Sequence, residues 1–505
     1  MMRSVPQSGT HFLTIDQGTS ATKALLFNRE GQLIQRHDTV HKQFYPQPGW
    51  VEHNPEEIYK NMLTSMREVL QLSCVKPENI ICISISNQRE TTIIWDRTTG
   101  KPVMNAIVWQ CQRAQEICQQ FQADGYGPTI RAKTGLILSP YFSAAKAKWI
   151  MNNCVDLQDD IDPKNLLFGT VDSYLVWKFT DGNVHATDFS NASRTQLFNI
   201  HTLDWDDELL SLFDLHRGMM PEVRNSNDLF GETVELTDDI PIPIAGVIGD
   251  SHAAFFGQCC MRKGMAKATY GTGSSVMMNV GQKPIISTER VVTSIGYAVD
   301  GDIAYVLEGN INCTGATIKW LVDDLELIKN AHESETLAAS VESNLGVYLV
   351  PAFVGLGAPY WNSDVRAVIT NISRDAKKAH IVRAAVESIA YQILDVVQAM
   401  KEESGIDLSE IRVDGGPTRN NFLMQFQADM VNCAVIRNRI EEISATGAMY
   451  MGGLGMGLWN SMEEIETLRE IGDTFVSACD DQWRKQNYAG WKRAVKNLLE
   501  TSVSD

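Results

Sequence analysis

The chain has 505 residues, of which 44% are apolar and 21% charged, a composition typical of globular proteins and unlike that of a largely disordered chain. Because one hydrophobic core rarely serves more than about 250 to 300 residues, this length predicts two large domains or three of ordinary size, and we favour two. The 62 acidic and 44 basic residues give a formal charge of −18 at pH 7, which disfavours nucleic acid as a partner because a polyanion is repelled.

The cysteines and the N-terminal segment carry information about the cellular compartment. Ten cysteines are scattered without a C-x-x-C pair or a metal-ligand spacing, which favours reduced thiols. Residues 1–12 lack the apolar stretch of a signal peptide, and no segment approaches the roughly 18 consecutive apolar residues of a membrane span. We therefore expect a cytoplasmic protein without a membrane span.

The first predicted element is a β-hairpin over residues 12–27, FLTIDQGTSATKALLF, in which two apolar runs flank the polar turn DQGT. A hairpin of the same form is predicted over residues 266–280, AKATYGTGSSVMMNV, with GTG at its turn. The two turns lie about half the chain apart, which indicates two related halves rather than two unrelated domains. Such turns expose backbone N–H groups suited to phosphates, although each one alone is also typical of a simple tight turn.

Between the two hairpins, predicted strands alternate with a helix. Residues 79–96 contain two β-rich runs around the polar turn NQRE, and residues 143–153 are helical in character. Residues 242–250, IPIAGVIGD, have the branched apolar side chains of a buried strand and end on Asp250. A carboxylate at the end of such a strand is a candidate functional group.

The second half continues this alternation. Residues 346–361 indicate a strand and a Gly-Pro loop, 378–400 have apolar residues at helical spacing, and 411–425 indicate a strand, a Gly-Gly turn and a helix. Strands that alternate with helices predict an α/β architecture. We place the division between an N-terminal domain, residues 1–257, and a C-terminal domain, residues 258–505.

Two common nucleotide-binding motifs are absent from the sequence. There is no G-x-x-x-x-G-K-[ST] segment, which excludes a P-loop, and no G-x-G-x-x-G segment follows a strand in the context of a dinucleotide-binding fold. If the protein binds a nucleotide, we therefore expect the nucleotide to lie between the two halves.

Ten ordered blocks between about residue 11 and residue 495 resemble the FGGY carbohydrate kinases, and most of all the glycerol-phosphorylating members of that family. The blocks are TIDQGTSATK, ISNQRETTIIWD, NAIVWQCQRAQEIC, PYFSAAKAKWI, LFGTVDSYLVWK, NASRTQLFNIHTLDWDD, TYGTGS, VPAFVGLGAPYW, RAAVESIAYQ and VDGGPTRNNFLMQFQ. The resemblance implies an α/β fold of two ribonuclease-H-like domains, of the actin and hexokinase type, with an ATP and substrate cleft between them.

The resemblance also implies an activity. The expected enzyme is a phosphotransferase that uses ATP and Mg²⁺ to phosphorylate glycerol to sn-glycerol 3-phosphate, as a homodimer or homotetramer. Two alternatives stay open: the same chemistry on a longer polyol or ketose, and a non-enzymatic ATPase, because fold alone does not fix function.

Roles for individual residues on the acceptor side follow from the same resemblance. Asp250 would be the general base that takes the proton from the attacking hydroxyl, although a helix N-cap is also a possible role. Arg89 and Glu90 would bind polyol hydroxyls, since arginine supplies donors and glutamate acceptors. Trp109 and Tyr141 would pack on the carbon face of the polyol. From the residues alone, Arg89 and Glu90 could equally form a surface turn, and Trp109 could be a core aromatic.

Residues expected to contact the nucleotide fall on both halves. The resemblance implies Thr19, Ser20, Ala21, Lys23, Thr272, Gly315, Lys319, Gly416 and Asn420. Asp16, through water, and Asp250 are expected to hold Mg²⁺.

The sequence departs from the family pattern at several of these positions. Ser251 and His252 stand where two glutamines are usual, and Ser275 stands where an aromatic side chain is usual. Ser251 and Ser275 are expected to line the acceptor pocket and to enlarge it, which favours a polyol or ketose of four or five carbons as the alternative acceptor. Lys23 replaces a usual arginine and Lys319 a usual glutamine. For His252, a second acid or base, a hydroxyl ligand and a structural hydrogen bond all stay open.

Overall fold

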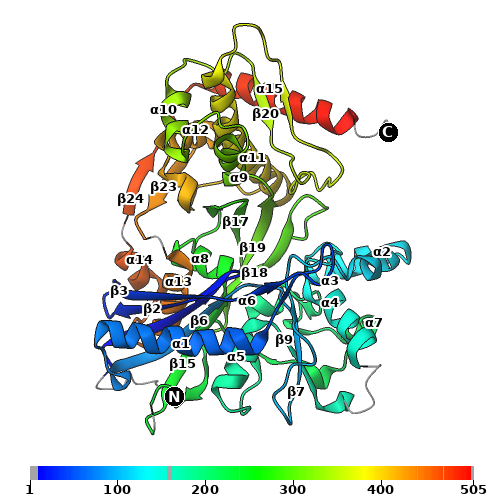
Figure 1. The fold of residues 1–505 in the computed structure, drawn as a ribbon, viewed down its shortest axis with the longest axis vertical. Helices are drawn as coiled ribbons and strands as arrows, with labels where there is room; N and C mark the ends of the chain where they lie inside the picture. Colours follow the sequence, from blue (N-terminus) through cyan, green and yellow to red (C-terminus); the bar gives the residue numbers. More distant parts are fainter. Residues whose placement is uncertain (1–8, 156–161, 238, 441, 470, 502–505) are drawn as a thin grey trace.

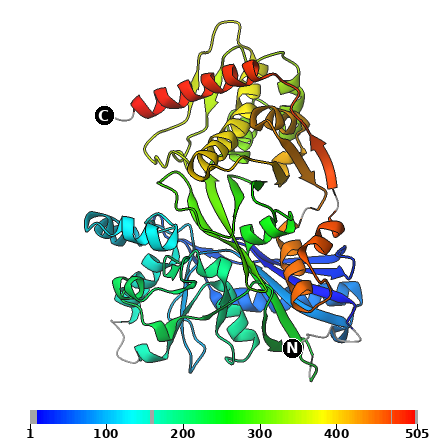
Figure 2. The ribbon, with the colours of Figure 1, turned by 180° about the vertical axis from the view of Figure 1, so that it is seen from behind.

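The computed structural model describes residues 9–155, 162–237, 239–440, 442–469 and 471–501, which form two lobes (Figure 1). The lower lobe in that view contains the first large sheet, and Figure 2 shows the same two lobes from behind. Within the described ranges, no helix combines the length and the apolar character that crossing a membrane requires.

A six-stranded sheet forms the centre of the first lobe. In spatial order its strands are β14 (Leu229–Thr233), β15 (Ile242–Gly249), β6 (Ile80–Asn87), β1 (His11–Gln17), β2 (Ala21–Asn28) and β3 (Leu33–Val40). β1 is antiparallel to β2 and parallel to β6, which is in turn parallel to β15. The predicted first hairpin is therefore confirmed, and it lies in the middle of a mixed sheet.

A seven-stranded sheet forms the centre of the second lobe. In spatial order its strands are β18 (Val292–Val299), β19 (Asp302–Ile311), β17 (Ser274–Gly281), β16 (Met265–Tyr270), β22 (Glu410–Asp414), β23 (Ala434–Asn438) and β24 (Ile471–Phe475). β16 is antiparallel to β17 and parallel to β22, which confirms the second predicted hairpin.

The two sheets share one strand order. The series β3-β2-β1-β6-β15-β14 has the same sequence of parallel and antiparallel pairings as β19-β17-β16-β22-β23-β24, and β18 is an additional edge strand. The matching strand orders agree with the prediction that the chain consists of two related halves.

Helices cover both sheets, and short strands pair outside them. The α-helices are α1 (Pro55–Ser73), α2 (Gln115–Ala123), α3 (Gly127–Thr134), α4 (Ser143–Ile150), α5 (Val171–Phe179), α6 (Phe189–Ala192), α7 (Asp207–Leu212), α8 (Asp250–Gly257), α9 (Gly315–Asp323), α10 (Ala331–Ala339), α11 (Lys378–Ser404), α12 (Asn421–Val431), α13 (Ile443–Gly455), α14 (Met462–Leu468) and α15 (Asp481–Thr501). The short strands are β4 (Gln43–Phe44), β5 (Glu52–His53), β7 (Ile93–Asp96), β8 (Ala106–Ile107), β9 (Leu166–Gly169), β10 (Ala186–Asp188), β11 (Phe198–Asn199), β12 (Asp204–Trp205), β13 (Glu222–Arg224), β20 (Tyr348–Val350) and β21 (Val368–Thr370).

The helix α13 returns the chain to the first lobe. It follows β23 of the second sheet, yet it packs on α8 and on β15, β6 and β1 (Figure 1). Glycines permit this close approach, because a Cβ on Gly447 would lie 1.9 Å from the carbonyl oxygen of Ala253, and one on Gly452 would lie 2.2 Å from Ser84 Oγ. A segment from after residue 257 thus completes the first lobe, while the division of the chain at residue 257 stays a prediction.

The β18–β19 hairpin belongs to the second sheet but is hydrogen-bonded to the first lobe. Thr293 of β18 donates its N–H to the carbonyl of Gly135 at 2.9 Å, and the Tyr305 hydroxyl of β19 donates to the carbonyl of Ile200 at 2.6 Å. Side chains of β19 are therefore held in a fixed position against the first lobe.

Candidate active site

Asp250 lies at the junction of β15 and α8. Gly249 is the N-cap of α8, so Asp250 is the first helical residue and the N-cap alternative is wrong. Its Oδ1 accepts the N–H of Ser251 at 2.6 Å and lies 3.3 Å from Arg89 Nε, while the side chain stays 36% exposed. Burial raises the pKa of this carboxyl to about 6 in spite of the opposing attraction of Arg89. The carboxylate can therefore accept a proton near neutral pH.

The turn NQRE, which follows β6, carries Arg89 and Glu90 into the interior. Arg89 is 5% exposed and Glu90 is 1% exposed, so the surface-turn alternative is wrong. Glu90 adopts a φ of 61°, and Gly249 leaves room for the arginine, since a Cβ there would lie 2.7 Å from Arg89 Cγ. The last residue of β15 thus leaves space for Arg89, and the first residue of α8 is the candidate base.

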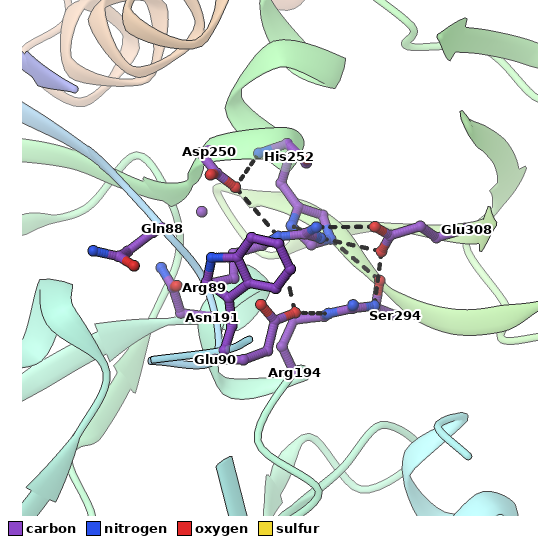
Figure 3. Close-up of polar contacts among 12 residues, drawn as sticks. Gln88, Arg89, Glu90, Asn191, Arg194, Asp250, His252, Ser294 and Glu308 are labelled. Carbon is purple, nitrogen blue, oxygen red and sulfur yellow. Dashed lines mark hydrogen bonds and ion pairs between the residues drawn. The ribbon is translucent and has the colours of Figure 1, made fainter. Parts of the chain in front are cut away.

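The Arg89 guanidinium faces partners on several sides (Figure 3). Nη1 and Nη2 donate to Oε2 and Oε1 of Glu308 at 3.1 and 2.9 Å, and Nη1 also lies 3.4 Å from His252 Nδ1. Glu308 is a fully buried residue of β19. Burial would raise the pKa of Glu308, but Arg194 and Arg89 outweigh it and hold the pKa well below its usual range.

Arg194 connects Glu308 with Glu90. Its Nε donates to Oε1 of Glu90 at 2.6 Å, and its Nη1 lies 2.7 Å from Oε2 of Glu308. The guanidinium carbon is 5.0 Å from the ring centroid of Phe142. Two buried cations and two buried anions therefore form a neutral cluster, which is the arrangement in which buried charge is tolerated.

No spacing pattern in the sequence predicts Arg194 or Glu308. Arg194 lies inside a block that resembles the family, but nothing local distinguishes it from a surface arginine. Glu308 interrupts the apolar run AYVLEG, and a charged residue within a strand that is otherwise buried requires a partner. The interruption of this apolar run is the one sequence signal for Glu308, and it does not show which residue the glutamate pairs with.

Trp109 and Tyr141 border this cluster. Both side chains are half-buried, their ring centroids are 5.5 Å apart in an edge-to-face contact, and Trp109 is therefore not a fully buried core aromatic. The indole Nε1 donates to Thr19 Oγ1 at 3.0 Å, which joins the expected acceptor residues to the first Gly-Thr turn. The Tyr141 carbonyl accepts a hydrogen bond from Lys146 Nζ at 2.6 Å, and burial lowers the pKa of Lys146 to about 7.

His252 is buried and makes structural hydrogen bonds. Its Nδ1 faces Arg89, and its Nε2 lies 3.2 Å from Ser294 Oγ. Burial, and then the charge of Arg89, hold the pKa of His252 well below its usual range. The imidazole is therefore neutral, with Nδ1 as acceptor and Nε2 as donor, so the structural alternative is the one that the contacts favour.

The two predicted pocket serines come from different lobes. Ser251 is half-buried in the first turn of α8, and Ser275 is half-buried in β17. Ser275 is paired with Asn310, and Met277 is paired with Glu308, so Ser275 and Glu308 share one face of the second sheet. The buried Ser275 Oγ has no hydrogen-bond partner among the residues that the structure describes.

The first Gly-Thr turn is closed by a bond from the Gly18 N–H to the carbonyl of Ala21 at 3.0 Å. Within it Thr19 is half-buried, Ser20 is exposed and Ala21 is half-buried. His41 Nε2 lies 2.7 Å from the Thr19 carbonyl oxygen, and this contact holds the backbone of the turn. The turn thus presents short hydroxyl side chains from a fixed backbone.

Asp16 and Lys23 face each other across the same hairpin. Lys23 Nζ lies 3.4 Å from Asp16 Oδ2 and 2.8 Å from Glu442 Oε2, so this predicted phosphate contact is engaged by two carboxylates. Asp16 also accepts a hydrogen bond from Ser86 Oγ at 3.1 Å. Burial raises the pKa of Asp16, although the charge of Lys23 opposes the shift.

A cavity of about 740 Å³ lies in the second lobe, between α9, α10 and α12. Five of the predicted nucleotide residues line it: Thr272, Gly315, Lys319, Gly416 and Asn420. The other four, Thr19, Ser20, Ala21 and Lys23, lie in the first lobe and do not line it. The cavity itself is therefore formed by one lobe only.

Backbone contacts shape this cavity. The Gly315 N–H donates to the carbonyl of Gly271 at 3.0 Å and fixes the start of α9 against the second Gly-Thr turn. Asn420 caps α12, since its Oδ1 accepts the N–H of Leu423 at 2.9 Å. Lys319, whose side chain is 78% exposed, lies 3.1 Å from Asp323 at the edge of the cavity.

Family models match both lobes. Residues 11–257 match the N-terminal domain, and residues 266–456 the C-terminal domain, of the FGGY family of carbohydrate kinases. Among curated relatives, glycerol kinase of Caldanaerobacter subterraneus subsp. tengcongensis is 48% identical over 97% of this chain and 99% of its own length. Glycerol kinase 1 of Thermotoga maritima is 49% identical over 97% of this chain and 99% of its own length.

Solved structures agree with these matches. The structure of Plasmodium falciparum glycerol kinase with ADP has a TM-score of 0.92 and 36% identity, and covers 97% of this chain and 98% of its own. Gluconate kinase from Lactobacillus acidophilus has a TM-score of 0.88 and 19% identity over 98% of each chain, which shows the fold alone. The two family models and these glycerol kinase relatives show a phosphotransferase that acts on an alcohol group. The chain belongs to the FGGY family of carbohydrate kinases, which confirms the predicted fold.

Proposed function

We propose that this protein transfers a phosphoryl group from ATP to glycerol and forms sn-glycerol 3-phosphate. The observation that carries the proposal is Asp250, a carboxylate with a raised pKa that lies 3.3 Å from Arg89 at the end of β15. The buried pair of Arg89 and Glu90 beside it offers donors and acceptors to a vicinal diol. The shared name of the relatives supports glycerol as the acceptor.

In the proposed reaction, Asp250 accepts the proton of a terminal hydroxyl while that oxygen attacks the γ-phosphorus. The bond from the γ-phosphorus to the bridging oxygen breaks, and ADP leaves. Arg89 and Glu90 hold the remaining hydroxyls, while Trp109 and Tyr141 pack on the carbon chain. Positioning and charge neutralisation supply most of the acceleration in such transfers.

The carboxylates on the first lobe fit a magnesium ion that arrives with the nucleotide. Asp16 is one of the charges that raise the pKa of Asp250, so a cation near both would relieve their repulsion. The part of the chain that the structure describes holds no group of three or more metal-binding side chains, and Mg²⁺ usually takes one or two carboxylates plus substrate phosphates. We infer that Asp16, through water, and Asp250 hold Mg²⁺, which neutralises phosphate charge when bound.

The nucleotide is proposed to lie with its adenosine part in the cavity of the second lobe. Its lining includes Thr272 of the second Gly-Thr turn together with Gly315, Lys319, Gly416 and Asn420. The phosphates are assigned to that turn and to the first one, with the contacts Thr19, Ser20, Ala21 and Lys23.

A longer polyol or ketose is the second candidate acceptor. The observation that favours it is the buried Ser275 hydroxyl, which has no partner among the described residues and can receive a hydrogen bond from an additional substrate hydroxyl. Ser251, beside Asp250, adds a second short polar side chain. A serine in place of a bulky side chain weakens discrimination by roughly 1 to 3 kcal/mol per lost packing contact.

A coupled assay of ADP release across glycerol, dihydroxyacetone, erythritol, threitol, arabitol, ribitol and xylulose tests the proposal. We expect the highest kcat/KM with glycerol, and a better four- or five-carbon acceptor would overturn that choice in favour of the second candidate. Ser275→Phe should shift the preference further toward glycerol because it fills the pocket. Ser226→Ala is the control, since Ser226 is a buried serine whose Oγ is bonded to Asp188 and to neither Ser251 nor Ser275.

A cytoplasmic location, a homodimer or homotetramer, and the domain limits 1–257 and 258–505 stay predictions.

A further inference from the structure

Glu308 is a residue of the second sheet that holds side chains of the first lobe. It lies within β19, is 0% exposed, and its two carboxylate oxygens accept from Arg89 at 2.9 and 3.1 Å. Its strand is part of the hairpin that Thr293 and Tyr305 bind to the first lobe. The backbone of Glu308 is therefore held by the hairpin, and its carboxylate is held by Arg89 and Arg194.

Glu308 sets the direction of the Arg89 guanidinium. A guanidinium carries five N–H donors in one plane. Two of them point to Glu308, one to His252 Nδ1, and Nε faces Asp250 (Figure 3). This arrangement leaves one N–H of Nη2 for a substrate hydroxyl. A rotation of the guanidinium plane would therefore point that N–H away from the substrate.

Glu308 also fixes Glu90 through Arg194. The Arg194 guanidinium lies 2.7 Å from Glu308 through Nη1 and donates to Glu90 at 2.6 Å through Nε. Arg194 is 0% exposed, so water cannot solvate its charge if one of the two carboxylates is neutralised. The loss of the Glu308 charge would leave two buried arginines to compete for Glu90.

We propose that Glu308 is a positioning residue of the acceptor site, which orients Arg89 directly and Glu90 through Arg194. Because Glu308 comes from the second sheet, the acceptor site takes its final geometry only when the β18–β19 hairpin is bound to the first lobe. The inference rests on the proposed function, since the acceptor roles of Arg89 and Glu90 belong to that proposal.

The substitution E308Q tests the inference, because glutamine keeps the shape of the side chain and removes its charge. We expect the KM for glycerol to rise about tenfold or more, while the KM for ATP changes less than about twofold. A purely structural role would lower the melting temperature and the active fraction but leave the ratio of the two KM values unchanged. An unchanged ratio in folded E308Q overturns the inference.

A second variant carries the test if E308Q does not fold. E308D keeps the charge and withdraws the carboxylate by one methylene, so we expect a smaller rise in the KM for glycerol, of roughly threefold or more. The KM for ATP should again stay constant. A wild-type KM for glycerol in E308D would contradict a positioning role.

Glu387 provides a matched control in the second lobe. It is 2% exposed and bonded to Arg383 at 2.7 Å, but it contacts none of the acceptor residues. E387Q should lower the melting temperature and leave both KM values near those of the wild type. An equal shift of the KM for glycerol in E387Q and E308Q would overturn the inference. If the wild-type protein does not phosphorylate glycerol, the proposed function is overturned instead.

Discussion

The proposed acceptor side and the proposed nucleotide side of this molecule are built from different chemical groups. On the acceptor side, Arg89, Glu90, Arg194 and Glu308 are each at most 5% exposed and are joined by contacts of 2.6 to 3.1 Å. On the nucleotide side, glycines and backbone groups contribute to the cavity wall, and Lys319 at its edge is 78% exposed.

The difference shows two ways of making a site specific. Buried charges that are paired with each other hold a few donors and acceptors in fixed directions, which suits a small polar acceptor. Glycines let backbone surfaces approach a larger ligand closely, which suits a nucleotide. The acceptor side should therefore be sensitive to changes of charge that preserve shape, and the nucleotide side to the addition of a single methyl group.

The largest effect is expected from Asp250→Asn, which removes the proton acceptor and preserves the shape of the acceptor side. We expect kcat to fall by about a thousandfold or more, while the dissociation constant for glycerol, measured by calorimetry, changes little. Asp395→Asn serves as the control, because Asp395 is a buried carboxylate bonded to Tyr360 and Trp491 in the second lobe. That variant should lose stability and keep its turnover, whereas substantial turnover in Asp250→Asn would remove Asp250 from the role of base.

Gly315→Ala tests the nucleotide side with one methyl group. A Cβ at this position would lie 2.5 Å from the carbonyl oxygen of Gly271, so the start of α9 must move away from the second Gly-Thr turn. We expect the KM for ATP to rise roughly ten- to hundredfold, with little change in the KM for glycerol. In Gly218→Ala the added Cβ meets no atom within 4 Å, so both KM values should be unchanged. A larger effect on glycerol than on ATP would break the comparison between the two sides.

The pH dependence should report on the acceptor side. Asp250 acts as a base only when it is deprotonated, and its pKa is raised to about 6. The kcat/KM for glycerol should therefore fall about tenfold per pH unit on the acid side of a midpoint that lies at or below pH 6, because Mg²⁺ bound to this carboxylate lowers its pKa further. A midpoint above pH 6, or a profile without an acid limb, would contradict this assignment.

The same pKa shift separates loss of activity from unfolding. Because the folded state holds the Asp250 proton more tightly than the unfolded state does, protonation of this residue stabilises the fold as the pH falls from about 6 toward 4. Melting temperatures measured at each pH should show that the enzyme is still folded where its activity declines.

The smallest effect is expected from Trp109→Phe, which tests whether the two sides are coupled. The indole N–H donates to Thr19 Oγ1 at 3.0 Å, so its loss removes one hydrogen bond between the acceptor side and the first Gly-Thr turn. We expect a change of roughly five- to tenfold, shared between the KM for glycerol and the KM for ATP. Trp205→Phe is the control, since the indole N–H of Trp205 donates to the Pro221 carbonyl and to none of the proposed site residues. A change confined to glycerol would show that the two sides act independently.

Local patterns in the sequence were sufficient for much of the fold. Both hairpins, the buried strand that ends before Asp250, and the long helix α11 were predicted from apolar periodicity and turn residues. The two hairpins pair residues that are close in the chain, and the burial of β15 and of one face of α11 leaves a run or a periodic pattern of apolar residues in the sequence. The resemblance supplied the candidate acceptor and nucleotide residues, which no periodicity could have assigned.

Contacts between distant residues could not be predicted in this way. Arg89 and Glu308 lie 219 positions apart, and Lys23 and Glu442 lie 419 positions apart. The helix α13 crosses back to the first lobe, and no local pattern indicates which sheet it joins. His252 was an ambiguous departure in the sequence, and its structural role follows only from its neighbours Arg89 and Ser294.

The sequence by itself indicated the two related halves, an alternation of strands with helices, and the family to which the chain belongs. Only the tertiary structure showed that Glu308, from the other half, bonds to the proposed acceptor residue Arg89, and that second-lobe residues alone line the cavity proposed for the nucleotide. The physical reason is that periodicity encodes which face of an element is buried, whereas the pairing of a buried charge depends on which elements the fold brings together.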